Sequence, residues 1–204
     1  MVLGPRRPTL ARARSTGRRP VTTVHTVGHG TKTTEELLGV LRSTDIETLI
    51  DVRRFPGSRR HPHLGREGLE RALPAAGLAY EWWGEELGGR RSGRRDAPSR
   101  HPAWRNASFR AYADHMDTPE FRTALERLVL AAGERRIAIM CAETVWWRCH
   151  RRLIADALVV RGVEVVHLLS ERRSEPHKLH EAARADEEGR VVYDVGFGPV
   201  LFDG

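Results

Sequence analysis

The chain has 204 residues, of which 40% are hydrophobic and 30% charged, so it can bury the core of one domain of ordinary size. No apolar run approaches the roughly 20 residues that cross a bilayer, and two cysteines are too few for a disulfide scaffold. The basic N-terminus lacks the apolar segment of a secretion signal. We therefore expect a cytoplasmic protein that does not associate with membranes and whose cysteines are free thiols.

The formal net charge is +7, and arginine carries nearly all of the positive charge. Only Lys32 and Lys178 of the 34 basic residues are lysines, which leaves 32 arginines. An excess of arginine can reflect codon usage as well as an anionic ligand. The total charge therefore does not by itself indicate nucleic-acid binding.

Residues 1–20 combine Arg, Pro and Gly with almost no apolar spacing, which predicts a disordered basic tail. Residues 21–204 then alternate between apolar, β-branched runs and segments with helical spacing. In chain order the sequence predicts a strand from residue 21, a helix capped by Thr33, a strand at 46–52, a helix at 66–76, a strand at 78–83, helices at 108–116 and 119–132, a strand at 137–141, a helix at 149–161 and a strand at 163–169.

Two segments depart from this alternation. Residues 84–106 have no period and many Gly, Pro, Ser and Arg residues, which predicts an irregular loop of the kind that often serves as a functional lid. We expect the charged stretch after residue 170 to be helical, and residues 191–204 to form a short strand and a tail. The alternation as a whole predicts a single α/β domain, with a largely parallel sheet flanked by helices.

Ligands of open α/β sheets bind beyond the carboxyl ends of the strands. Three predicted strands stop just before polar residues, so we expect these side chains to meet at one edge of the sheet. They are His29 after the first strand, Asp51 and Arg53 at the end of the second, and Cys141 and Glu143 after the strand at 137–141. For each residue taken alone, an ordinary loop position is the competing interpretation.

Residues 140–152 hold both cysteines and predict a strand end, a loop and a helix start. A thiol at a helix N-terminus, among arginines and a histidine, should have a lowered pKa and be a better nucleophile. Nucleophile, redox pair, metal ligands and structural thiols all remain open for the two cysteines. No paired CxxC or HxxxH spacing supports a metal site, so we expect neither a metal nor a cofactor. The candidates in this segment are Cys141, Glu143, Arg148, Cys149, His150 and Arg151.

Two pairs of adjacent tryptophans lie near the expected edge, at 82–83 and 146–147. Neighbouring residues on a strand face opposite sides, so one member of each pair could stack on a base while the other joins the core. We take Trp83 and Trp146 as the candidates for stacking. His167 lies within an apolar strand, where a hydrogen-bonded core histidine is expected.

Four motifs together resemble the domain-of-unknown-function family 488 over about residues 24–169. They are Val27-Gly28-His29, Leu49-Ile50-Asp51-Val52-Arg53 with Pro56 and Ser58, Leu87-Gly88-Gly89, and Met140-Cys141-Ala142-Glu143 followed by Cys149-His150-Arg151. The resemblance implies an α/β fold with two signature cysteines and a link to nucleic-acid metabolism, with DNA repair as one candidate. Gly28, Ser58, Gly88 and Gly89 lie within these motifs, and we take them as candidate binding residues. The strand end at Asp51 and the cysteine-bearing loop resemble rhodanese-like domains as well, so we expect a Rossmann-like or rhodanese-like three-layer arrangement.

These features favour an enzyme. We expect a thiol-dependent transferase or hydrolase that acts on an anionic substrate, a nucleotide or a nucleic acid, at the carboxyl edge of the sheet. The alternative is a non-catalytic nucleic-acid-binding module with structural cysteines. The sequence carries no indication of the oligomeric state. The expected catalytic residues are Cys141, Glu143, Cys149, His150, Asp51 and His29, and the expected binding residues are Arg53, Ser58, Arg148, Arg151, Gly28, Trp83, Trp146, Gly88 and Gly89.

Overall fold

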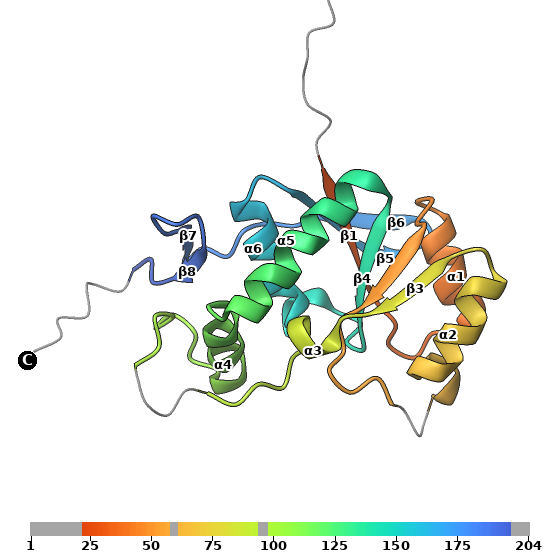
Figure 1. Ribbon diagram of the computed structural model, residues 1–204, viewed down its shortest axis with the longest axis horizontal. Helices are drawn as coiled ribbons and strands as arrows, with labels where there is room; N and C mark the ends of the chain where they lie inside the picture. The colour runs from red at the N-terminus through yellow and green to blue at the C-terminus, as the bar shows by residue number, and fades with distance from the viewer. Residues whose placement is uncertain (1–21, 58–60, 94–97, 197–204) are drawn as a thin grey trace, which may run out of the picture.

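The computed structural model describes residues 22–57, 61–93 and 98–196, and its centre is one six-stranded sheet (Figure 1). The strand order is β3-β2-β4-β1-β5-β6, in which the first five strands are parallel and β6 is antiparallel to β5. A separate antiparallel pair, β7 and β8, follows β6. The strands are β1 (Thr23–Gly28), β2 (Thr48–Asp51), β3 (Ala79–Trp82), β4 (Ile137–Cys141), β5 (Glu164–Ser170), β6 (Arg173–Pro176), β7 (Ala183–Ala185) and β8 (Val191–Tyr193).

Helices connect the parallel strands, and side chains cap the starts of α1, α4 and α5. Thr33 accepts a hydrogen bond from the Glu36 backbone N–H while the Glu36 carboxylate accepts one from the Thr33 backbone, which is a complete capping box. Asn106 and Thr118 cap two later helices in the same way with their side chains. The helices are α1 (Thr34–Arg42), η1 (Pro62–Leu64), α2 (Arg66–Ala75), α3 (Gly84–Leu87), α4 (Ala107–Met116), α5 (Pro119–Glu134), η2 (Trp146–Arg148) and α6 (Arg151–Val160).

The sheet lies between two layers of helices, as expected from the sequence. Helices α1 and α2 cover one face, and α5 and α6 cover the other (Figure 1). Strand β4 shows how the two cores form: Ile137, Ile139 and Cys141 belong to the core on the α5–α6 side, while Ala138 and Met140 belong to the core under α1 and α2. Because side chains alternate along a strand, Cys141 ends β4 facing α6.

Parallel register brings the strand ends to one edge. Gly28 pairs with Cys141, and Asp51 pairs with Met140, so β1, β2 and β4 end at the same level. Backbone pairing continues one step further, because the N–H of His29 donates to the Cys141 carbonyl at 3.0 Å. The loops that follow these strands therefore start from fixed positions beside one another.

Two expectations about local structure need correction. The charged stretch after residue 170 is not helical: it forms β6, β7 and turns. The reason is tertiary, since β6 completes the sheet against β5, and buried Asp156 of α6 accepts hydrogen bonds from the His177 ring and the His180 backbone. The expected loop at 84–106 begins with the single helical turn α3.

Helix boundaries differ by small amounts. The helix expected from residue 149 starts at Arg151, after the 3-10 turn η2, and α4 starts one residue earlier than expected. The predicted tail at 1–20 lies outside the described residues. Within the described ranges, no helix combines the length and apolar composition that spanning a bilayer requires.

Candidate functional site

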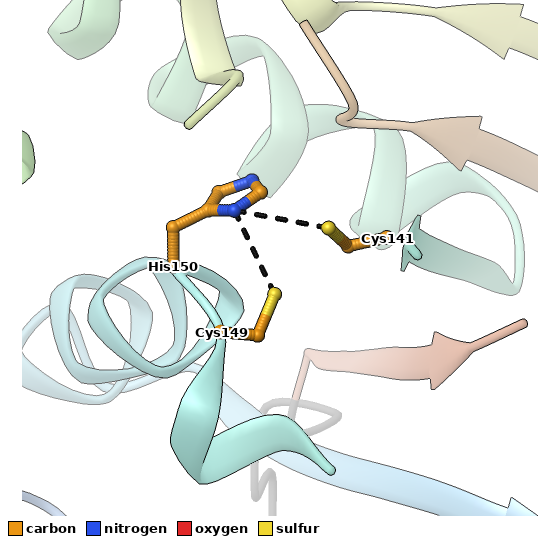
Figure 2. Close-up of side chains that lie close together, drawn as sticks. All are labelled: Cys141, Cys149 and His150. Carbon is orange, nitrogen blue, oxygen red and sulfur yellow. Dashed lines mark hydrogen bonds between the residues drawn. The ribbon is translucent and has the colours of Figure 1, made fainter. Parts of the chain in front are cut away.

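Two thiols and an imidazole meet at the carboxyl edge of the sheet (Figure 2). Cys141 is the last residue of β4, Cys149 lies between η2 and α6, and His150 is the N-cap residue of α6. Nδ1 of His150 lies 3.8 Å from Sγ of Cys141 and 3.6 Å from Sγ of Cys149. Both sulfurs are buried in the core under the edge, with only 7% and 3% of the two residues exposed.

A hydrogen bond from Nε2 of His150 orients the ring so that Nδ1 faces the sulfurs. Nε2 lies 3.1 Å from the carbonyl oxygen of Val52, which can only accept a hydrogen bond, so Nε2 carries the proton. Nδ1 is therefore the nitrogen that faces both sulfurs, where it can exchange a proton with them. Tyr112 packs against the ring with centroids 5.0 Å apart.

The pKa values of the two thiols are shifted in opposite directions. Burial raises the pKa of Cys149, but the hydrogen bond from Cys141, the neighbouring His150 and the charge of Arg151 outweigh it and hold that pKa well below its usual value. The backbone N–H of Arg151 also donates to the Cys149 sulfur at 3.5 Å. The hydrogen bond to Cys149, burial and the charge of Cys149 raise the pKa of Cys141. Of the two sulfurs, Cys149 is the one that the geometry favours as a thiolate.

Arg151 is a buried cation beside the thiols. It is only 1% exposed, and its guanidinium donates to the Thr26 hydroxyl at 3.2 Å and to the Glu143 carbonyl at 2.5 Å. Its Nε is buried without a hydrogen-bond partner. Among the described residues no carboxylate forms an ion pair with this guanidinium. A thiolate on Cys149 is therefore the anion that would compensate its charge.

A pocket of about 310 Å³ opens above the cluster. Both thiols and the His150 ring line it, and α4 forms the opposite wall. The exposed fraction of Phe55 is 62%, which leaves an apolar surface at the mouth. The lining residues are Arg53, Arg54, Phe55, Gly89, Arg90, Asn106, Ser108, Phe109, Tyr112, Cys141, Ala142, Glu143, Arg148, Cys149 and His150.

The cations at this pocket are mostly free of acidic partners. Arg54 donates to the Arg90 carbonyl, and the Arg90 and Arg148 side chains are exposed. Within the described ranges none of these three arginines pairs with a carboxylate, and Glu143 is the one acidic residue among those that line the pocket. The mouth therefore carries an excess of positive charge that suits an anion.

Asp51, Arg53 and His29 form a network below the pocket. The Arg53 guanidinium donates to both carboxylate oxygens of Asp51, with a closest distance of 2.5 Å, and to Nε2 of His29 at 2.9 Å. Tyr80 donates to the same carboxylate at 2.8 Å. Burial and the Arg53 charge lower the pKa of His29 to about 4, so the ring is neutral near pH 7. Asp51 and His29 orient Arg53, which is the member that lines the pocket.

Among the predicted glycines and tryptophans, some lie at the pocket and others do not. Gly89 lines the pocket, while Gly28 and Gly88 lie where backbone segments approach closely: a Cβ at Gly28 would lie 2.0 Å from the Glu143 carbonyl oxygen. Trp83 packs in the core under the Arg127 guanidinium, away from the pocket. Trp146 stacks on His167 with centroids 4.2 Å apart and also lies outside the pocket lining. Ser58 lies outside the described residues.

Sequence reasoning missed part of the pocket wall. Phe109 and Tyr112 come from α4, and Asn106 is its N-cap, so they arrive from a helix rather than from a strand end. The one available signal was the cap at Asn106, which fixes where that helix starts. His167 is a hydrogen-bonded core histidine, as its apolar strand indicated.

The same cluster offers ligands to a metal ion. Cys141, Cys149 and His150 place their ligand atoms within 4.8 Å of one another, and no other group of three or more His, Cys, Asp or Glu in the described ranges does so.

Comparison with known proteins adds a family but no activity. The family model described as "Domain of unknown function DUF488" matches residues 33–158, which include both cysteines and the strand end at Asp51. No curated protein and no solved structure match the chain. The expected likeness to rhodanese-like domains is therefore not shown.

Proposed function

The chain belongs to the family DUF488, whose description assigns no activity, and we therefore propose from the site itself that it is a thiol-dependent enzyme acting on an anionic substrate. One observation carries this proposal: a thiol pair in contact with an imidazole nitrogen lies at the floor of a pocket whose mouth holds arginines that no carboxylate of the described residues pairs with. A reactive nucleophile and a binding site for negative charge are thus next to each other.

Cys149 is the nucleophile of this proposal. It attacks the electrophilic atom of the substrate as a thiolate whose proton is held by Nδ1 of His150, and Cys141 donates a hydrogen bond to the attacking sulfur. A bond from sulfur to the substrate forms while the bond to the leaving group breaks, and His150 gives the proton to the leaving group. Water in a hydrolase, or a second substrate in a transferase, then releases the bound group from Cys149.

A nucleotide or nucleic acid fits the chemistry of the pocket. Arg54, Arg90 and Arg148 can bind phosphate, and Phe55, Phe109 and Tyr112 offer aromatic surface to a base. The volume of about 310 Å³ lies at the small end of the range for ligand pockets, which favours a mononucleotide-sized group inside it.

Two alkylating reagents that differ in charge test this proposal. We expect iodoacetate, an anion, to modify Cys149 faster relative to neutral iodoacetamide than it modifies a free thiol, because the arginines concentrate the anion. The double variant Arg90→Gln/Arg148→Gln should reduce that preference severalfold. Arg71→Gln is the matched control, since Arg71 is an exposed arginine on α2, outside the pocket. A nucleoside monophosphate should protect the thiol, and equal rates for both reagents would contradict the proposal.

The arginines at the mouth of the pocket also support the alternative, a non-catalytic module that binds nucleic acid. Such a module predicts thiols that react only after unfolding. It also predicts oligonucleotide binding whose affinity falls steeply with salt concentration. Reactive, anion-selective thiols together with salt-insensitive or undetectable oligonucleotide binding would exclude this alternative.

A further inference from the structure

The three atoms at the thiol cluster are spaced as ligands of one metal ion (Figure 2). In a tetrahedral zinc site with bonds of about 2.3 Å to sulfur and about 2.0–2.1 Å to nitrogen, sulfur and nitrogen lie about 3.5–3.6 Å apart. The two sulfurs lie 3.6 and 3.8 Å from Nδ1 of His150, and all three atoms are within 4.8 Å of one another. Coordination would therefore require shifts of only a few tenths of an ångström in the sulfur–nitrogen spacing.

We propose that Cys141, Cys149 and His150 bind one zinc ion, with the fourth coordination position open to the pocket. Thiolate sulfur and imidazole nitrogen are the ligands that zinc prefers, and two cysteines with one histidine leave the open position typical of reactive zinc sites. All three residues line the pocket, so an ion can enter from solvent.

The surroundings of the cluster orient these ligands as a metal site requires. A ligating histidine donates its other ring N–H to a carbonyl or carboxylate, and Nε2 of His150 donates to the Val52 carbonyl at 3.1 Å. The backbone N–H of Arg151 donates to the Cys149 sulfur, which stabilises a coordinated thiolate. Each ligand is thus held by backbone: Cys141 by the end of β4, and Cys149 and His150 by the start of α6.

The two thiolates would also neutralise the charge of the ion. Zinc carries two positive charges, and binding displaces the protons that remain on the two thiols, so the ion and two thiolates form a neutral group. Arg151 then remains as the buried cation beside it, and an anion at the open position would compensate that charge.

Zinc coordination weakens the thiol reaction proposed for this site, because each sulfur shares electron density with the ion and Nδ1 of His150 can no longer hold the proton. Zinc is thus expected to be a reversible inhibitor of the proposed thiol reaction. The inference does not depend on that reaction, since coordination needs only the three ligands. It departs from the expectation of no metal, which rested on the lack of paired CxxC or HxxxH spacing: here the ligands come from a strand end and from two adjacent residues at a helix start.

Zinc binding to the reduced, full-length chain tests the proposal. Competition with a chromophoric chelator should show one zinc ion per chain. Cys141→Ser, Cys149→Ser and His150→Ala should each weaken binding at least about tenfold. His63→Ala is the matched control, because His63 is exposed on η1, outside the pocket, and should leave the affinity unchanged. An affinity that none of the three ligand substitutions alters would overturn the assignment.

Measurements on the unmodified chain keep the test decisive if a variant does not fold. Cobalt(II) should bind with the absorption bands of a tetrahedral ion bound to thiolates, and zinc should displace it. Zinc should also block alkylation of both cysteines, and a chelator should restore it. Binding without protection of the thiols would place the ion elsewhere and overturn the inference. Thiols that react without anion preference would contradict the proposed enzyme but not the zinc site.

Discussion

The backbone of Gly89 lies against the imidazole of His150. A Cβ atom at Gly89 would be 2.8 Å from Nδ1 and 3.2 Å from Cγ of that ring. Real Cβ atoms essentially never approach another heavy atom below 3.0 Å, so the ring could not keep its place beside any larger residue. Glycine at this position allows the segment after α3 to lie directly against the His150 ring.

Gly89→Ala should therefore impair the thiol site while leaving the fold in place. The added methyl group pushes Nδ1 away from the sulfurs, and displacements of about 1 Å at a reactive group can lower rates by about a hundredfold. We expect alkylation of Cys149 to slow by about ten- to a hundredfold. Gly93→Ala is the control, because its Cβ would meet only the Cβ of Ala111 at 3.9 Å. Equal rates in the two variants would show that His150 does not assist the thiol.

Much of the edge of the sheet could be predicted from the sequence, because local rules determine it. Apolar strands that stop at His29, Asp51 and Cys141 place these residues at one level once the strands are parallel. The wall formed by α4 could not be predicted, since helix packing rather than strand order brings Tyr112 to His150. The burial of Arg151 was hidden as well, because a charged residue at a helix start ordinarily faces solvent.

Tertiary packing also explains why the helix predicted after residue 170 is wrong. Charge and polarity favoured a helix, but β6 completes the sheet as an edge strand, and two histidines beyond it bond to buried Asp156. Edge strands tolerate charged side chains, so their composition resembles that of an exposed helix. Long-range pairing of this kind leaves little trace in local periodicity.

The ion pair between Asp51 and Arg53 should matter for stability. Asp51 is fully buried, so Asp51→Asn removes the charge that compensates the guanidinium and leaves Arg53 buried without its partner. Breaking a buried pair from one side costs about 3–5 kcal/mol. Asp45→Asn is the matched control, because Asp45 pairs with Arg136 on the surface, where its side chain is 80% exposed, and such pairs contribute about 0–1 kcal/mol. Urea unfolding at pH 7 measures the free energy of unfolding of both variants. Similar losses of stability in the two would contradict the structural role of Asp51.

Gly28 should tolerate no larger residue at the edge of the sheet. A Cβ there would lie 2.0 Å from the Glu143 carbonyl oxygen and 2.8 Å from the Arg151 guanidinium, so Gly28→Ala must displace the loop after β4. We expect a lower unfolding midpoint and slower alkylation together. Gly133→Ala provides the contrast: this exposed glycine of α5 has no atom within 4 Å of its Cβ position, and alanine should stabilise the helix by up to about 1 kcal/mol. If Gly28→Ala changed neither the unfolding midpoint nor the alkylation rate, the loop after β4 would not be held against β1.

His167 should make the stability depend on pH. It belongs to a buried chain of hydrogen bonds in which Nδ1 contacts the Thr26 hydroxyl at 2.7 Å, Nε2 contacts the His177 ring at 2.9 Å, and His177 bonds to Asp156. Arg151 donates to the same Thr26 hydroxyl. Burial, together with the nearby charges of His177 and Arg151, lowers the pKa of His167 from 6.5 to about 3.

The sign of the effect follows from the two protonation states. Between pH 6.5 and about 3 the unfolded chain holds a proton on His167 that the folded chain does not, so the free energy of unfolding decreases as the pH falls. One proton contributes about 1.4 kcal/mol for each pH unit in this range. Urea unfolding at pH 7, 6, 5 and 4 should show a shallower decrease for His167→Gln than for the unmodified chain. The exposed-site control His63→Gln should retain the steeper slope. Parallel curves for His167→Gln and the unmodified chain would show that folding does not lower the pKa of His167.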